Sequence, residues 1–237
     1  MTVSHQSSVK SGMTPNPVLN LDSGIFGQLR RDCGVGWTDY VAHPFVRALG
    51  DGSLAREKFQ KYLIQDYLFL VQYSRAYALL AYKLDNMADM RTALQTATAL
   101  LAVELPLHVQ YCASWAIAEP EMAAATPTLE LLAYTRFVLE LGSAGDSLDL
   151  MVALAPCIIG YAEIGAALSP HVHPDNPYAA WIEMYSGAEY AALAEAAISQ
   201  LDELGTRRGA AARYDSLLAS FKTATMLETA FWEMAWR

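Results

Sequence analysis

The chain of 237 residues carries a formal net charge of −9 at pH 7, and its isoelectric point is near 5.0. Such a negative balance disfavours nucleic acids and anionic membranes as partners, because both repel a negative surface. Hydrophobic residues make up 54% of the sequence, which predicts a large buried core. The 3 cysteines form no CxxC or Cys/His pattern, so they favour free thiols in a reducing cytoplasm over a zinc site.

The first 20 residues are polar and contain proline, which predicts a flexible N-terminal leader rather than a signal peptide. In residues 21–237, segments rich in alanine and leucine alternate with breaks that are too short to be domain boundaries, and strand signals are nearly absent. No uncharged apolar run reaches the roughly 18 residues that span a bilayer. We therefore expect one soluble, all-α domain of about seven or eight helices.

The first long helix is expected after Ser53, which is placed to cap it. A stripe of residues in alternating steps of four and three marks one face of this helix: Phe59, Leu63, Asp66, Leu70, Tyr73, Tyr77, Leu80 and Leu84. Asp66 stands at a position that the stripe assigns to the core. A buried carboxylate is costly unless it is hydrogen-bonded or paired, so Asp66 is either a satisfied core group or a functional one.

A second stripe contains Leu101, Glu104, His108, Tyr111 and Trp115. A carboxylate and an imidazole four residues apart could bind iron or manganese, but dimetal sites in bundles use about six ligands and often Glu-x-x-His pairs. We expect no metal here, and interpret the pair as a hydrogen bond between Glu104 and His108 that steadies a kink at Pro106. His171 and His173 are expected in a solvated, proline-rich loop.

Two further helices direct polar groups inward. One stripe consists of Leu150, Leu154, Cys157, Tyr161, Ile164 and Leu168, and the last helix contributes Phe221, Ala224, Glu228, Phe231 and Ala235. Pro156 beside Cys157 costs about 3 kcal/mol or more inside a helix, a cost that sequences carry at functional sites. An acid, a thiol and a second acid (Asp66, Cys157 and Glu228) that faced one cavity would suit nucleophilic catalysis with proton transfer.

Several ordered segments carry a resemblance to a known family. They are HPFVRALGDGSLAREKFQKYLIQDYLFL (43–70), ELPLH (104–108), AYTRFVL (133–139), LAPCIIGYAEIG (154–165), WIEMYSGAEY (181–190) and LETAFWEMAW (227–236). Together they resemble the thiaminase II, or TenA, family over roughly residues 37–236. The resemblance implies a haem-oxygenase-like helical bundle without haem or another cofactor, usually assembled as a homotetramer, with a dimer as the alternative.

The resemblance also implies an activity. Family members hydrolyse 4-amino-5-aminomethyl-2-methylpyrimidine to the 5-hydroxymethyl form in thiamine salvage, and many cleave thiamine itself. Cys157 corresponds to the nucleophile, Glu228 to the acid that protonates the ring nitrogen, and Asp66 to the carboxylate that accepts hydrogen bonds from the pyrimidine amino group. Cys157 thus places the chain in the cysteine-containing branch.

The aromatic positions that line the family's pocket correspond to Tyr134, Tyr161, Tyr185 and Phe231. Phe69 is a departure, because some members have there a tyrosine hydroxyl that assists the cysteine. Phenylalanine can line the pocket but donates no hydrogen bond. We expect Tyr161 or another hydroxyl to take that part, or Cys157 to be less activated.

Two alternatives from other classes stay open. One is a metal-dependent oxidase on the same bundle, which would use Glu104, His108 and further acids. The other is a non-catalytic protein that binds or senses a pyrimidine, which would need Asp66 and the tyrosines but no nucleophile. The presence of both Cys157 and Glu228 favours the hydrolase.

Overall fold

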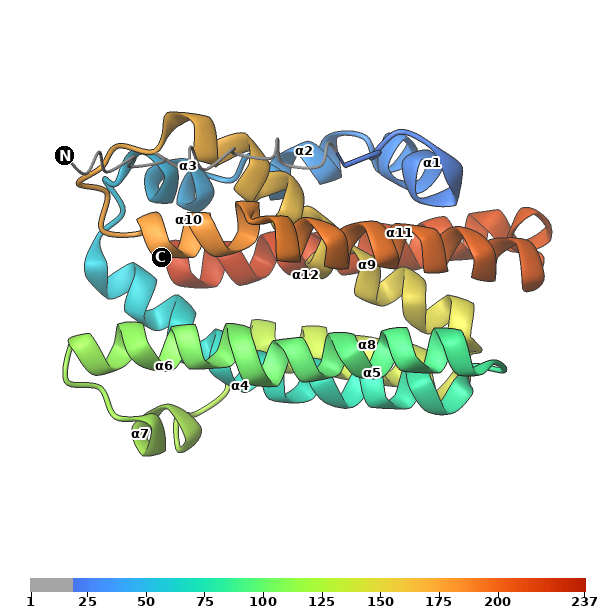
Figure 1. Cartoon of the computed structure of the whole chain (residues 1–237), viewed down its shortest axis with the longest axis horizontal. Helices are drawn as coiled ribbons and strands as arrows, with labels where there is room; N and C mark the ends of the chain where they lie inside the picture. The colour runs from blue at the N-terminus through green and yellow to red at the C-terminus, as the bar shows by residue number, and fades with distance from the viewer. Residues whose placement is uncertain (1–18) are drawn as a thin grey trace, which may run out of the picture.

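The computed structural model describes residues 19–237, and within them the chain forms helices and loops without a β-strand (Figure 1). The α-helices are α1 (Gly24–Cys33), α2 (Val35–Val41), α3 (Pro44–Asp51), α4 (Arg56–Lys83), α5 (Met87–Ala99), α6 (Leu105–Ser114), α7 (Glu119–Ala123), α8 (Leu129–Ala144), α9 (Ser147–Leu168), α10 (Ala179–Ser186), α11 (Ala188–Arg207) and α12 (Tyr214–Trp236). A π-helix, η1 (Leu100–Glu104), and two 3-10 helices, η2 (Ser169–His171) and η3 (Ala210–Arg213), complete them.

The predicted all-α class is confirmed, but the predicted number of about seven or eight helices is wrong for the described residues. The difference comes from short helices such as α2 and α7, which have only 7 and 5 residues. Of the predicted leader, residues 1–18 lie outside the described part of the chain. Leu19, at its end, packs against the core.

Helix α9 lies at the centre of one continuous hydrophobic core and contacts α2, α4, α8, α10, α11 and α12. Figure 1 shows it running obliquely behind α11 and α12 toward α8. With η2 it forms a segment of 25 residues that is long and apolar enough to cross a membrane, yet 83% of its most apolar window is buried inside the protein. A helix that is apolar all round is typical of such a buried position.

Pro156 does not break α9, which continues to Leu168. Proline has no N–H to donate, so one internal helix bond is missing there. Hydroxyl groups of two neighbouring helices bind carbonyl oxygens beside it: Tyr73 donates to Leu154 at 2.5 Å, and Tyr40 donates to Pro156 at 3.2 Å. Gly160 allows this approach, because a Cβ atom there would lie 2.3 Å from Cε1 of Tyr40.

The stripe along α4 is confirmed, since all its members are buried, but the predicted cap is wrong. Helix α4 begins at Arg56 after Ala55, which has no side-chain cap. The backbone N–H of Ser53 instead donates to Oδ1 of Asp51 at 2.9 Å. Ser53 belongs to the preceding turn, in which Gly52 has a φ of 78°.

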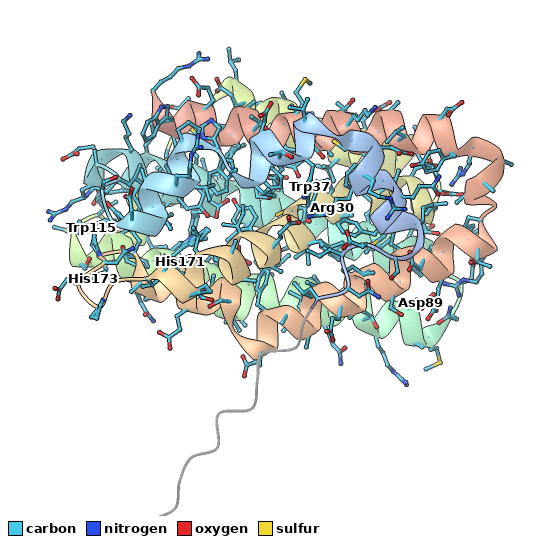
Figure 2. All side chains as sticks on the ribbon, turned by 90° about the horizontal axis from the view of Figure 1, so that it is seen from above. Arg30, Trp37, Asp89, Trp115, His171 and His173 are labelled. Carbon is cyan, nitrogen blue, oxygen red and sulfur yellow. The ribbon has the colours of Figure 1, made fainter. Side chains whose placement is uncertain are left out.

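The second stripe is only partly confirmed, because η1 joins α5 to α6 just before Pro106. A π turn contains an additional residue and therefore rotates the faces of the helix on either side of it. Leu101, predicted inward, is 48% exposed, whereas Glu104 and His108 are buried. As predicted, His171 and His173 are exposed and lie at one end of the molecule (Figure 2).

Candidate active site

The three residues that the sequence directs inward from different helices lie in one buried cluster. Cys157 comes from α9, Glu228 from α12 and Asp66 from α4, and they are 5%, 2% and 2% exposed. The charges of Glu228 and Asp66 both act on the Cys157 thiol. The structure therefore brings together the acid, the thiol and the second acid.

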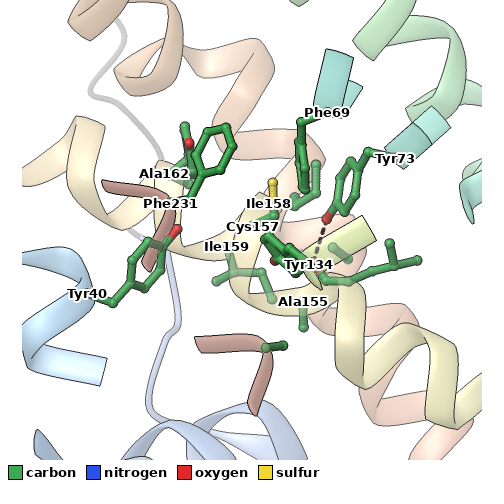
Figure 3. Close-up of a cluster of buried hydrophobic side chains, with 14 of the residues drawn as sticks. Tyr40, Phe69, Tyr73, Tyr134, Ala155, Cys157, Ile158, Ile159, Ala162 and Phe231 are labelled. Carbon is green, nitrogen blue, oxygen red and sulfur yellow. Dashed lines mark hydrogen bonds between the residues drawn. The ribbon is translucent and has the colours of Figure 1, made fainter. Parts of the chain in front are cut away.

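An aromatic group surrounds the thiol. The ring of Phe69 stacks on Tyr73 at 5.1 Å between centroids, and lies 5.0 Å from Tyr134 and 5.7 Å from Phe231. Figure 3 shows these four rings around Cys157. Three of the rings were predicted to line the site.

A second aromatic group adjoins the first. The ring of Tyr161 lies 4.9 Å from Tyr185, 5.8 Å from Trp181 and 5.3 Å from Trp232. Both predicted tyrosines are therefore adjacent and buried. The two tryptophans were not predicted as part of the site, because large apolar rings at inward positions look the same in a core and in a pocket.

Glu228 is held so that it keeps its proton at neutral pH. Burial raises its pKa to about 8, and hydrogen bonds from the Tyr134 hydroxyl and from Cys157 oppose this shift. The Tyr134 hydroxyl donates to Oε1 of Glu228 at 2.7 Å. A buried carboxyl group with a pKa near neutrality can serve as a general acid.

Cys157 is a thiol in the resting protein. Burial raises its pKa, and the negative charges of Glu228, Glu104 and Asp66 raise it further, while a hydrogen bond with Tyr73 lowers it. Tyr73 is thus the hydroxyl beside the sulfur where Phe69 offers none. Sequence reasoning missed this role, because Tyr73 reads as one more core residue of the α4 stripe.

Asp66 and Glu104 each accept a hydrogen bond from a tyrosine. Tyr62 donates to Oδ2 of Asp66 at 3.1 Å, and Tyr185 donates to Oε1 of Glu104 at 2.6 Å. The predicted hydrogen bond between Glu104 and His108 is therefore wrong. In the described part of the chain, neither ring nitrogen of His108 has a hydrogen-bond partner, and its Nε2 lies 3.5 Å from Oδ2 of Asp66.

These buried groups have strongly perturbed affinities for protons. Burial, followed by the charge of Glu104, raises the pKa of Asp66. Burial also raises the pKa of Glu104 to about 7 and lowers the pKa of His108 to about 3. Perturbed groups of this kind cluster at functional sites.

Asp66, Glu104 and His108 form the donor set on which the oxidase alternative depends. One possible ligand atom from each lies within 4.8 Å of the others. Dimetal sites in helical bundles use about twice as many ligands, contributed by four helices. This set fits a pair of metal ions poorly.

The comparisons with known proteins agree with this architecture. The family model described as TENA/THI-4/PQQC matches residues 35–237. An aminopyrimidine aminohydrolase from Halalkalibacterium halodurans is 37% identical over 203 residues, which cover 84% of this chain and 90% of the relative. A protein of the same name from Helicobacter pylori is 34% identical over 203 residues, covering 85% and 93%.

Solved structures show the same fold. A TenA family transcription regulator from a Silicibacter species is 42% identical, with a TM-score of 0.85 over 89% of this chain and 96% of that one. A domain from Shewanella denitrificans with a haem-oxygenase-like fold has a TM-score of 0.67 over 88% and 90% at 13% identity, which bears on the fold alone. The fold is thus the predicted haem-oxygenase-like bundle, and the chain belongs to the TENA/THI-4/PQQC family.

Proposed function

We propose that this protein is an aminopyrimidine aminohydrolase of thiamine salvage that uses Cys157 as its nucleophile. The observation that carries the proposal is the burial of Cys157, Glu228 and Asp66 beside the packed rings of Phe69, Tyr134 and Phe231. The names of the relatives from Halalkalibacterium and Helicobacter support the reaction class. The substrate that we propose is 4-amino-5-aminomethyl-2-methylpyrimidine.

Binding would use the aromatic rings and Asp66. A flat, electron-poor pyrimidine would pack against the faces of Phe69, Tyr134 and Phe231, because the Phe69 ring lies within 6 Å of each of the other two. Asp66 would accept a hydrogen bond from the amino group on the ring. Its bond from Tyr62 occupies Oδ2 and fixes the orientation of the carboxyl group.

The first half of the reaction makes a covalent adduct. Glu228 gives its proton to the ring nitrogen and, as a carboxylate in contact with the thiol, takes the proton of Cys157. The sulfur then adds to a ring carbon, so a C–S bond forms and the ring loses its aromatic character. The Tyr73 hydroxyl, which donates to the Leu154 carbonyl in the ligand-free protein, would turn to the thiolate and stabilise it during this step.

The second half exchanges the amine for water. The aminomethyl group already carries an additional proton at neutral pH, so it leaves as ammonia when its C–N bond breaks. Water adds to the exocyclic carbon that remains and gives up one proton. The C–S bond then breaks, which restores the aromatic ring, and the ring nitrogen gives its proton back through Glu228 so that Cys157 again becomes a thiol. Cleavage of thiamine would follow the same steps with the thiazole as the leaving group.

The free thiols and the exposed apolar side chains suggest the compartment and the oligomeric state of the protein. The buried, unpaired thiols of Cys33, Cys112 and Cys157 favour a reducing cytoplasm. Exposed apolar side chains on α5, such as Met87 and Leu94, offer a surface for association, so we expect a homotetramer or a dimer. Light scattering on the purified protein measures the assembly.

The test is a parallel incubation with the aminomethyl pyrimidine and with thiamine, in which ammonia and thiazole release are measured. We expect ammonia release at a rate that depends on Cys157. Binding of the pyrimidine without release of either group would favour the pyrimidine-sensing alternative. Turnover that requires added iron or manganese would favour the oxidase.

A further inference from the structure

His108 is a buried base that the proposed reaction does not use. Its side chain is fully buried on α6, and among the described residues neither ring nitrogen has a hydrogen-bond partner. A buried polar group without a partner costs about 1–3 kcal/mol. His108 lies beside two carboxyl groups and destabilises the ligand-free protein by about this amount. Such a destabilising residue is explained if it has a function when the ligand is bound.

A carboxyl oxygen close to the imidazole ring indicates which group His108 acts on. Its Nε2 lies 3.5 Å from Oδ2 of Asp66, slightly beyond hydrogen-bond length. Such contacts are often long in a ligand-free site and shorten when the ligand binds. The π-helix η1 contributes to this arrangement, because it ends at Glu104 and leads into α6, so that Glu104 and His108 both face Asp66.

The groups around Asp66 disfavour its ionised form, so a nearby base is needed to take up its proton. Burial, Glu104 and Glu228 all disfavour its ionised form, and only the hydrogen bond from Tyr62 favours it. The titratable groups that face the Asp66–His108 pair come from five elements: Tyr62 (α4), Glu104 (η1), Cys157 and Tyr161 (α9), Tyr185 (α10) and Glu228 (α12). None of these groups carries a positive charge. Burial alone lowers the pKa of His108 to about 3, and an ionised Asp66 beside it would raise that pKa, so His108 becomes a cation only when Asp66 loses its proton.

We infer that His108 is the proton partner of Asp66: when Asp66 accepts the hydrogen bond of the pyrimidine amino group, its carboxyl proton moves to Nε2 of His108. The O–H bond of Asp66 breaks and an N–H bond of His108 forms, so the pair keeps the same total charge. His108 is thus a positioning residue, because it acts on the ligand through Asp66. This inference rests on the proposed function.

If His108 takes up the proton of Asp66, the ligand can bind without releasing a proton from these two residues to solvent. Without His108, the proton of Asp66 must leave the protein before the carboxylate can accept a hydrogen bond. Binding then becomes weaker as the pH falls, by about tenfold for each pH unit below the pKa of Asp66. Packing alone would not produce such a pH dependence.

The experiment is calorimetry with the hydroxymethyl pyrimidine, which is the proposed product and is not turned over. Titrations near pH 6 in buffers of different ionisation enthalpy count the protons released on binding. The variant is His108→Gln, whose amide reaches the position of Nε2 but cannot take up a proton. His171→Gln, at the exposed end of η2, is the matched control.

We expect His108→Gln to release up to one proton more per site than wild type, and its dissociation constant to rise more steeply than that of the control as the pH falls. Equal proton counts in wild type and variant would overturn the inference while leaving the proposed function intact. A wild-type protein that does not bind the pyrimidine would overturn the proposed function, and this inference with it.

A second measurement does not depend on the folding of a variant. Nitrogen NMR of the histidine side chains in the wild-type protein distinguishes a neutral imidazole from an imidazolium. We expect one buried histidine to become doubly protonated when the hydroxymethyl pyrimidine binds. If every buried histidine stays neutral in the saturated protein, His108 does not accept the proton.

Discussion

Replacing Glu228 by glutamine is expected to make the protein more stable than wild type at alkaline pH. Burial raises the pKa of Glu228 from 4.5 to about 8, so the folded protein binds this proton more tightly than the unfolded chain does. The stability linked to this group is complete below about pH 4.5 and is lost as the pH rises through about 8. Glutamine cannot ionise, and its oxygen can still accept the hydrogen bond of Tyr134.

The size of the effect follows from the rise in pKa. A change from 4.5 to about 8 is worth at most about 5 kcal/mol, at about 1.36 kcal/mol for each pKa unit. In a chain of 237 residues, about 1 kcal/mol moves the Tm by about 2–4 °C. The Glu228→Gln protein should therefore melt above wild type at about pH 9, by at most about 10–20 °C, and close to wild type at about pH 5.

The assay is thermal unfolding of both proteins across this pH range. Glu104, whose pKa is raised to about 7, makes both proteins lose stability as the pH rises, so the difference between their Tm values carries the test. Glu140→Gln, an exposed glutamate on α8, is the control and should leave this difference near zero at every pH. Parallel Tm curves for Glu228→Gln and wild type would refute the reasoning.

Three further substitutions test other contacts. Gly160→Ala places a Cβ atom 2.3 Å from the ring of Tyr40 and should cost about 1–3 kcal/mol, measured by denaturant unfolding; unchanged stability would mean that Tyr40 does not pack on α9 in solution. Asp66→Asn should weaken pyrimidine binding by about tenfold or more in calorimetry, because charge-assisted hydrogen bonds are worth about 1.5–3 kcal/mol. Tyr73→Phe removes the hydroxyl that lowers the pKa of Cys157, so the rise of kcat with pH should move to higher pH; an identical profile would exclude Tyr73 from activating the thiol.

The long stripes were predictable because burial along a regular helix repeats with the helical period. The α4 stripe placed Asp66, and the α9 and α12 stripes placed Cys157 and Glu228 inward, as the structure has them. The resemblance to the TenA family added the aromatic residues. A periodic pattern shows which side chains face the core but not which of them are in contact. The pattern therefore could not predict that these aromatic residues surround the thiol.

The region from Leu100 to His108 was less predictable for a physical reason. The π-helix at Leu100–Glu104 contains an additional residue, so the residues before and after it do not keep the regular spacing of inward positions. Leu101 therefore faces solvent, and the partner of Glu104 is Tyr185 on α10 rather than His108 one turn away. Contacts between residues far apart in the sequence decide both outcomes.

The nucleophilic role of Cys157 is the central claim, and the Cys157→Ser protein tests it most directly. The hydroxyl of serine is far harder to ionise than a thiol, while the change in shape is small. Turnover of the aminomethyl pyrimidine and the rise in Tm caused by the hydroxymethyl pyrimidine are measured on the same sample. The account predicts that turnover is almost lost while the ligand still raises the Tm as it does in wild type; turnover close to that of wild type would contradict it and place the chemistry on Glu228 alone.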